Sequence, residues 1–223
     1  MSVPFRDRYD AGRQLGAQLG QYADRPDVLV LGLPRGGVPV AFEVGQAIHA
    51  PLDVFIVRKL GVPGHEELAM GAIASGGTVV LNEEVVTEAR IPQRVIDAVI
   101  AREEQELMRR DRLYRDDRPP PEVRGKTVLL VDDGLATGST MRAAVAALRQ
   151  QGPAAIVVAV PVAAPSTCEA FRQEVAETIC AVTAEPFYAV GLWYQDFAPT
   201  SDEEVRSLLR RAAISVPLAS QAA

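Results

Sequence analysis

Cysteine, histidine and aromatic side chains are scarce in this sequence of 223 residues, which has two cysteines, two histidines and 5% aromatic residues. The cysteines, Cys168 and Cys180, have neither the spacing of metal ligands nor the number that a disulfide framework requires, so we expect reduced, buried thiols. No apolar run reaches the ~18 residues that a membrane span needs. No basic segment followed by an apolar one opens the chain, which favours a cytoplasmic protein.

Positive charge is also in deficit, because the formal net charge is −6. This balance argues against a broad surface for nucleic acids or anionic membranes, and we expect neither as a partner. Apolar residues make up 48% and charged residues 23%, as in ordinary globular chains. The length fits one α/β domain. We expect this domain over residues 1–213 and a frayed tail over residues 214–223.

Short apolar runs alternate with segments of helical periodicity along most of the chain. Strands are predicted at residues 28–33, 52–57, 70–74, 78–81, 128–131, 155–160, 178–182 and 187–191. Helices are predicted at residues 5–22, 39–49, 95–112, 141–148 and 165–175, with a capped helix after 200–204. The alternation predicts an α/β fold with a parallel sheet, whose ligands bind beyond the carboxyl ends of the strands.

One segment combines a buried strand, two acids and a hydroxyl-rich turn. Four branched apolar residues at 128–131 fit a strand covered on both faces, and Asp132 and Asp133 follow directly. The loop at 134–140 then leads into the helical pattern. Its hydroxyls and the free N–H groups of a helix start favour a phosphate. The two acids are placed to accept hydrogen bonds from sugar hydroxyls, so the segment predicts a site for a sugar phosphate.

This segment resembles the phosphoribosyl-pyrophosphate (PRPP) signature of type I phosphoribosyltransferases, and the resemblance extends over residues 28–200. It implies a Rossmann-like parallel sheet flanked by helices, a mostly helical insertion at 82–125 and a small hood at 184–200. It also implies that PRPP binds with Mg²⁺ as cofactor. Mg²⁺ then binds through PRPP, with Asp132 and Asp133 as the candidate protein ligands. The implied PRPP-binding residues of this segment are Asp132, Asp133, Gly134, Leu135, Ala136, Thr137, Gly138, Ser139 and Thr140.

A second motif, Leu33-Pro34-Arg35-Gly36-Gly37, places a guanidinium beside two glycines at the end of a predicted strand. Arginine is a permanently charged donor fork that suits phosphate oxygens. Alone, the motif is equally compatible with a plain turn between strand and helix. Beside the PRPP signature it resembles the family's pyrophosphate loop, with Arg35, Gly36 and Gly37 as PRPP ligands. The resemblance also implies a cis Pro34–Arg35 peptide bond.

A third motif follows the predicted strand at 52–57 and contains Arg58, Lys59, His65, Glu66 and Glu67. It resembles the start of the family's mobile catalytic loop, which would exclude water from a cation-like transition state. Either basic residue could stabilise the departing pyrophosphate. His65 could protonate or contact a leaving group, and Glu66 or Glu67 could orient an incoming amine. The alternative is that the acids and His65 are solvated loop residues.

A fourth group concentrates aromatic rings near the end of the chain, at Phe187, Tyr188, Trp193, Tyr194 and Phe197, together with Asp196. Flat rings can sandwich a nucleobase, and a carboxylate can accept hydrogen bonds from its N–H groups. The resemblance implies a hood in which Tyr188, Trp193, Tyr194 and Asp196 bind the base. The alternative is that these rings close an edge of the core.

The resemblance implies transfer of the phosphoribosyl group of PRPP to a nitrogen of a nucleobase or related heterocycle, with release of pyrophosphate. The partners are then PRPP and the acceptor, in a homodimer or another homo-oligomer, as in purine salvage. The loop text around Ala136 looks like adenine enzymes, whereas residues 187–197 look like the hood of 6-oxopurine enzymes, so the acceptor stays open. Two alternatives are a PRPP-binding regulator without transfer activity and a nucleotide-binding enzyme that shares only the phosphate loop.

Overall fold

The computed structural model describes residues 5–116 and 118–215. The helices are α1 (Arg8–Gly16), α2 (Gly37–Ile48), α3 (Glu83–Glu88), α4 (Gln93–Arg115), α5 (Ser139–Gln150), α6 (Pro165–Glu174) and α7 (Asp202–Ser215), with short 3₁₀ turns at η1 (Gly20–Tyr22) and η2 (Val190–Trp193). The strands are β1 (Val28–Gly32), β2 (Leu52–Val54), β3 (Val57–Val62), β4 (His65–Ala74), β5 (Thr78–Leu81), β6 (Thr127–Val131), β7 (Ala155–Ala163) and β8 (Glu177–Thr183).

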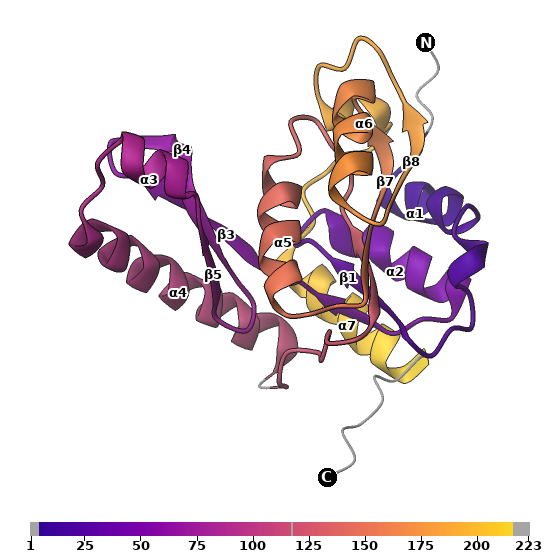
Figure 1. Ribbon diagram of the computed structural model, residues 1–223. Helices are drawn as coiled ribbons and strands as arrows, with labels where there is room; N and C mark the ends of the chain where they lie inside the picture. The colour runs from indigo at the N-terminus through magenta and orange to yellow at the C-terminus, as the bar shows by residue number, and fades with distance from the viewer. Residues whose placement is uncertain (1–4, 117, 216–223) are drawn as a thin grey trace.

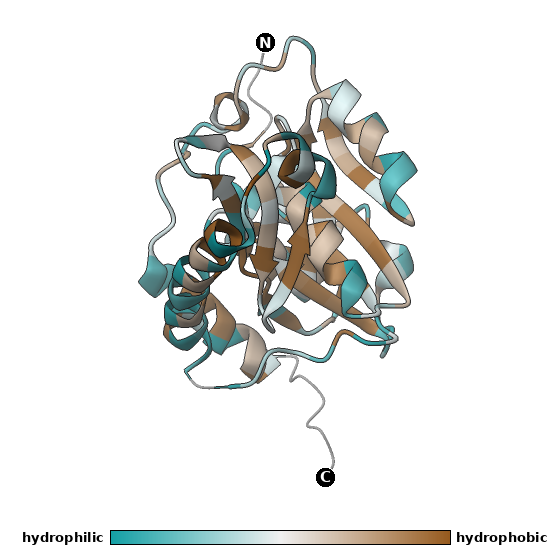
Figure 2. Cartoon of the chain, turned by 60° about the vertical axis from the view of Figure 1, so that its left-hand side comes forward, coloured by the Kyte–Doolittle hydropathy of each residue, from teal (hydrophilic) through white to brown (hydrophobic). Residues whose placement is uncertain are grey.

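Five parallel strands form the central sheet in the order β2-β1-β6-β7-β8 (Figure 1), which confirms the prediction of a parallel α/β sheet. The strands alternate their side chains between two apolar clusters, because successive residues point to opposite faces. Val30 and Leu129 pack with α1, α2 and α7 on one face, whereas Leu31 and Leu130 pack with α5 and α6 on the other. Figure 2 shows these strands mostly in the brown of hydrophobic residues. The continuous apolar runs of the sequence thus correspond to strands covered on both faces.

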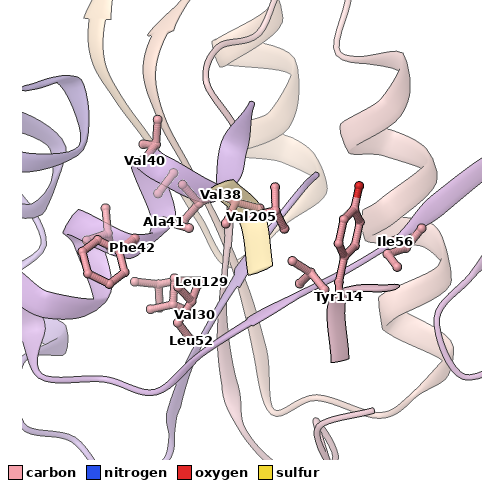
Figure 3. Packing of buried hydrophobic residues seen from close by; sticks show 14 of the residues in the cluster. Val30, Val38, Val40, Ala41, Phe42, Leu52, Ile56, Tyr114, Leu129 and Val205 are labelled. Atoms are coloured by element: carbon pink, nitrogen blue, oxygen red, sulfur yellow. The ribbon is translucent and has the colours of Figure 1, made fainter. Parts of the chain in front are cut away.

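Helix α2 covers one face of the central sheet over β1 and β2. Phe42 on α2 and Val205 on α7 belong to the same buried cluster as Val30, Leu52 and Leu129 (Figure 3). Burial of each such side chain contributes about 1.5–3 kcal/mol to the stability of the folded state. This packing fixes the position of the first turn of α2. Gly36, which precedes the helix, and Gly37, which begins it, are therefore held against the carboxyl end of β6.

A second, antiparallel sheet of order β3-β4-β5 lies beside the first and carries α3 and α4. We call β3, β4, β5, α3 and α4 the arm, because Figure 1 shows them extending away from the central sheet. The predicted hairpin around residues 75–77 is present between β4 and β5. The predicted single strand at 52–57 is wrong: β2 ends at Val54, and β3 begins at Val57 in the other sheet.

The base of the arm is fastened by a buried arginine. Arg115, at the end of α4, is 1% exposed. Its Nε lies 3.2 Å from Asp53 Oδ1, and its guanidinium also donates to the carboxylate of Asp111 and to the carbonyl of Val54. Burial raises the pKa of Asp53, and the charge of Arg115 opposes that shift. The last turn of α4 is therefore joined to the end of β2.

Several local predictions need correction. The first helix ends at Gly16 and is followed by η1, and the predicted strand at 187–191 is instead irregular chain leading into η2. The long helix ends at Arg115, where Asp116 takes a left-handed conformation, before the prolines that were expected to stop it. Helix α7 continues to Ser215, and the rest of the predicted tail lies outside the described residues. Within the described residues, no helix has the length and hydropathy of a membrane-spanning segment.

The prediction of two reduced thiols is also wrong. Cys168 on α6 and Cys180 on β8 form a disulfide with a Cα–Cα separation of 6.5 Å. Their spacing in the sequence carries no disulfide signature, because the pairing arises from the packing of α6 against β8. The disulfide therefore ties a helix on one face of the sheet to the edge strand.

Candidate functional site

Two acids follow the carboxyl end of β6, at the middle of the central sheet. Asp132 Oδ1 accepts a hydrogen bond from the backbone N–H of Asp133 at 2.9 Å. Burial raises the pKa of Asp132 well above its usual range, and the charge of Asp133 adds to this shift. Burial also raises the pKa of Asp133, whereas the neighbouring Arg8 lowers it. Burial and the second carboxylate therefore favour the neutral form of Asp132, whereas Arg8 favours the charged form of Asp133.

The glycines of the second motif bring its loop into direct contact with these acids. A Cβ atom on Gly37 would lie 2.7 Å from the carbonyl oxygen of Val131 and 2.8 Å from Asp132 Cα. A Cβ atom on Gly36 would overlap the carboxylate of Asp133. Only glycine permits this approach. The two loops, separated by about a hundred residues of sequence, thus form one continuous edge.

The Pro34–Arg35 peptide bond is cis, as predicted. Arg35 is 48% exposed, and its Nη1 lies 3.9 Å from Asp202 Oδ1 at the start of α7. Asp202 Oδ1 also accepts a hydrogen bond from the hydroxyl of Tyr114 on α4, at 2.6 Å. The guanidinium of Arg35 is therefore largely accessible beside the glycine pair, with one acid nearby.

The hydroxyl-rich turn at 134–140 is shaped by side chains from α5 and α6. Gly138 has a φ of +72° and caps the start of α5, and a Cβ atom there would lie 2.6 Å from the ring of Phe171. Thr167 Oγ1 donates to the carbonyl of Ala136 at 2.7 Å, and Arg142 Nη1 donates to the carbonyl of Thr137 at 2.8 Å. These donors occupy the carbonyl side of the turn. At the start of α5 the backbone N–H of Ser139 lies 3.5 Å from Thr137 Oγ1, and N–H groups of a first helical turn, which lack partners within the helix, can bind an anion.

The hydroxyl groups of the turn lie on its accessible side. The hydroxyl-bearing residues Thr137, Ser139 and Thr140 are all exposed. Leu135 is buried and forms a β-bridge with Ala163 of β7. Thr137 Oγ1 and Ser139 Oγ lie 3.1 Å apart. Hydroxyls and helix N–H groups in one turn match the donors that phosphate oxygens accept. The predicted PRPP residues at 35–37 and 132–140 are thus brought together by the fold.

The two basic candidates, Arg58 and Lys59, are neighbours on β3 of the arm. Their side chains point to opposite faces of the antiparallel sheet, because adjacent residues of a strand alternate. Arg58 Nη2 lies 2.7 Å from Glu103 Oε2 on α4, and Arg58 Nε donates to the same oxygen at 2.9 Å. Lys59 is exposed. Arg58 is therefore occupied by an internal ion pair, and Lys59 is the accessible base of the two.

The other predicted residues of the third motif lie at the far end of the arm. His65 begins β4 at the tip of the hairpin, paired with Val62, and this tip points away from the central sheet (Figure 1). The side chains of Glu66 and Glu67 lie outside the described part of the chain. The expected irregular catalytic loop is thus a β-hairpin, and His65 is not brought to the acids.

The aromatic group near the end of the chain divides into buried and accessible rings. Tyr194 is 5% exposed, and its hydroxyl donates to the carbonyl of Asp133 at 2.6 Å. Tyr188 is 80% exposed, and Trp193 stacks on Phe187 with ring centroids 6.1 Å apart. Tyr194 therefore holds the backbone of Asp133, and its buried ring does not offer the stacking face that was predicted for a base.

Asp196, the predicted acidic partner of a base, is exposed. Its Oδ1 accepts a hydrogen bond from the backbone N–H of Ala198 at 2.9 Å. This bond shapes the turn that leads to Ala198, whose carbonyl accepts a hydrogen bond from Arg8. One carboxylate oxygen of Asp196 thus has a structural partner in the hood.

Sequence reasoning missed Arg8, the first residue of α1. Its Nε lies 2.8 Å from Asp133 Oδ2, and its side chain is only 11% exposed. No motif surrounds it, and the contact spans 125 positions of sequence. The available signal was an arginine at the start of a predicted amphipathic helix, which gives no indication of this partner.

A family model for the phosphoribosyl transferase domain matches residues 6–187, and the chain belongs to this family. It is 46% identical over 208 residues to a Mycobacterium tuberculosis (strain H37Rv) protein named "Putative phosphoribosyl transferase Rv0571c", in a match that covers 93% of this chain and 47% of that protein. The chain thus spans about half the length of this curated relative.

Two further similarities extend the comparison. The chain is 35% identical over 129 residues to "Bifunctional protein PyrR" of Chloroflexus aurantiacus, in a match that covers 56% of this chain and 65% of that protein. The crystal structure of TT1426 from Thermus thermophilus superposes with a TM-score of 0.83 at 41% identity, covering 93% of this chain and 98% of that chain. The family membership expected from the PRPP signature is confirmed.

Proposed function

We propose that this protein transfers the phosphoribosyl group of PRPP to a ring nitrogen of a nucleobase-like acceptor and releases pyrophosphate. The observation that carries this proposal is the contact of Gly36 and Gly37 with Asp133 and Asp132. It joins a guanidinium-bearing glycine loop to an acidic pair, and a phosphate-binding turn follows at the same edge. PRPP has the three matching parts, which are a pyrophosphate, a diol and a 5′-phosphate.

In this proposal, the turn at 137–140 binds the 5′-phosphate through helix N–H groups and hydroxyls. Asp132 and Asp133 accept hydrogen bonds from the 2′- and 3′-hydroxyls. Anchoring the sugar at both ends holds its C1 atom in position for attack, which replaces a bimolecular encounter by a fixed geometry. Negative charge on this acidic pair also favours a ribosyl centre that becomes cationic as the bond breaks.

The leaving group departs toward the second loop. The acceptor nitrogen forms a bond to C1 with its lone pair, the bond from C1 to the pyrophosphate oxygen breaks, and pyrophosphate leaves with that electron pair. Arg35 and the amides of Gly36 and Gly37 receive the developing negative charge, because a guanidinium forms strong hydrogen bonds with phosphate oxygens. We propose Lys59 as a further donor, since it is the exposed basic residue of the pair on β3. The acceptor's ring proton is lost to solvent or to an acid of the hood.

Mg²⁺ fits this site as an ion carried mainly by the substrate. The described residues contain no group of three or more candidate metal ligands. The two carboxylates of Asp132 and Asp133 suit an ion that takes one or two protein ligands beside phosphate oxygens and water. When bound, Mg²⁺ neutralises charge on the pyrophosphate oxygens.

The acceptor is proposed to be a nucleobase or a related nitrogen heterocycle, as in purine salvage. The hood offers the exposed ring of Tyr188 and the ring of Trp193 for stacking. The second carboxylate oxygen of Asp196 is available to accept a hydrogen bond from a ring N–H. A homodimer is implied by the family and stays a prediction, which the mass of the protein in solution will measure.

The test is pyrophosphate release from PRPP and Mg²⁺ across a panel of bases. We expect release with one base or base class, and at least a roughly hundredfold loss in Asp133→Asn. The matched control is Asp97→Asn, which makes the same change at an exposed position of α4. Tight PRPP binding without turnover on any base would favour the regulator. Absence of PRPP binding would overturn both readings and leave an enzyme that shares only the phosphate loop.

A further inference from the structure

Arg8 is held on three sides in the middle of the candidate site. Its Nε donates to Asp133 Oδ2 at 2.8 Å, and its Nη1 donates to the carbonyl of Ala198 at 2.8 Å. Its guanidinium carbon lies 3.8 Å from the centroid of the Phe197 ring. Two hydrogen bonds in different directions and one ring face leave the guanidinium little freedom to move.

The same guanidinium also lies against the glycine loop. A Cβ atom on Gly36 would lie 3.2 Å from Arg8 Nε. The backbone of Asp133 is held separately, because the hydroxyl of Tyr194 donates to its carbonyl at 2.6 Å. Arg8 on α1 thus holds one carboxylate oxygen of Asp133, while Tyr194 of the hood holds the backbone carbonyl of the same residue.

We propose that Arg8 is a positioning residue that holds Asp133 in the orientation in which its carboxylate accepts a hydrogen bond from a hydroxyl of the bound ribose. The proposal rests on the function proposed above. A carboxylate fixed by a charge-assisted hydrogen bond is already oriented when the sugar arrives, so binding does not have to restrict it. Arg8 itself acts through Asp133 and through no atom of the substrate.

The identity of the residue follows from this geometry. An arginine can donate to Asp133 and to Ala198 from two nitrogens of one rigid plane while its face covers Phe197. A lysine has a single charged nitrogen and cannot hold both acceptors in the same way. We therefore expect Arg8→Lys to keep part of the effect and Arg8→Gln to lose it.

The test compares sugar phosphates that differ only in their hydroxyls. Ribose 5-phosphate and its 2-deoxy and 3-deoxy analogues are titrated by calorimetry into the wild type and into Arg8→Gln. We expect the wild type to bind ribose 5-phosphate about tenfold more tightly than at least one analogue, which is the scale of one charge-assisted hydrogen bond. Arg8→Gln should reduce that preference to less than about twofold.

Controls separate this role from a merely structural one. Arg13→Gln makes the same change on α1 at a side chain that is 48% exposed, and it should keep the wild-type preference. In a background that already carries Asp133→Asn, Arg8→Gln should weaken ribose 5-phosphate binding by less than about twofold more, because interacting residues are not additive. If Arg8→Gln lowers the melting temperature strongly, Arg8→Lys provides the same comparison.

The outcomes are distinct. If Arg8→Gln keeps the wild-type preference for ribose 5-phosphate over its deoxy analogues, the positioning role is overturned. This holds whether all three affinities fall equally or none changes. The proposed function stays in place in both cases. A wild type that binds neither PRPP nor ribose 5-phosphate would overturn the proposed function, and the positioning role with it.

Discussion

The edge of the central sheet and the arm bring charged residues together in different ways. At the sheet edge, Gly36 and Gly37 let backbone approach Asp132 and Asp133 so closely that no side chain fits between them. In the arm, Arg58 reaches Glu103 across an interface between a strand and a helix. Backbone contacts of the first kind fix a geometry, whereas long side chains can rearrange. The sheet edge is therefore the preformed part of the site.

The largest expected effect comes from adding one methyl group at the sheet edge. Gly37→Ala would place a carbon 2.7 Å from the carbonyl of Val131. The two loops would have to separate, which should cost about 1–3 kcal/mol in the free energy of unfolding and roughly a hundredfold or more in PRPP affinity. Thermal unfolding and calorimetry measure the two quantities.

The matched change in the arm is Gly64→Ala. Gly64 has a φ of +81° with open space around its Cβ position, so only the backbone conformation is penalised. We expect a loss of about 1 kcal/mol in unfolding free energy and PRPP affinity within about twofold of wild type. Equal PRPP affinities in the two alanine variants would contradict a preformed sheet edge.

The next expected effect is a change at Asp132 that raises the stability of the fold and lowers the affinity for PRPP. The pKa of Asp132 is raised in the folded protein, so the folded state holds this proton more tightly than the unfolded chain does. Stability contributed by the protonated carboxyl is present at low pH and is lost as the pH rises from the ordinary pKa through the raised one. Asp132→Asn removes this dependence and keeps an oxygen that can accept the hydrogen bond from the N–H of Asp133.

We therefore expect Asp132→Asn to melt at a higher temperature than the wild type at about pH 8, and to lose this advantage toward about pH 4. PRPP binding should fall by about a hundredfold, because the amide lacks the negative charge. Melting curves across this pH range measure the first effect, with Asp97→Asn as the exposed control. A variant that is less stable than the wild type under the alkaline condition would show that the acids support the fold.

The smallest effect divides the basic pair of the arm. Lys59→Gln should raise the KM for PRPP by about tenfold with the melting temperature unchanged, because Lys59 is exposed. Arg58→Gln should lower the free energy of unfolding by about 1 kcal/mol, because Glu103 is buried and loses a partner. Its KM for PRPP should stay within about twofold of wild type. The opposite assignment would mean that the arm presents Arg58 to the substrate.

The sequence was most informative where one element alone determines the structure. Four apolar residues before Asp132 predicted a strand buried on both faces, and the structure contains that strand as β6. Burial of the strand depends on a local pattern of apolar residues, which the sequence displays directly. The common location of the loops followed from the rule that parallel strands share a carboxyl edge.

Predictions failed where distant segments meet. Arg8 reaches Asp133 only after α1 has packed on the sheet, and Cys168 meets Cys180 only when α6 lies on β8. The expected loop after Lys59 is instead a hairpin, because the chain leaves the central sheet after Val54 and β3 pairs with β4. Periodicity gives the type of an element and carries no information on which partner it chooses.

The ion pairs of Arg115 limit how the arm can be exchanged between related proteins. Its guanidinium has carboxylate partners both inside the arm, at Asp111, and outside it, at Asp53. A transplanted arm that lacks this arginine would leave the buried carboxyl of Asp53 without its partner, at a cost of about 3–5 kcal/mol. A chimera that exchanges the arm should therefore keep Arg115 of α4 together with Asp53 of β2.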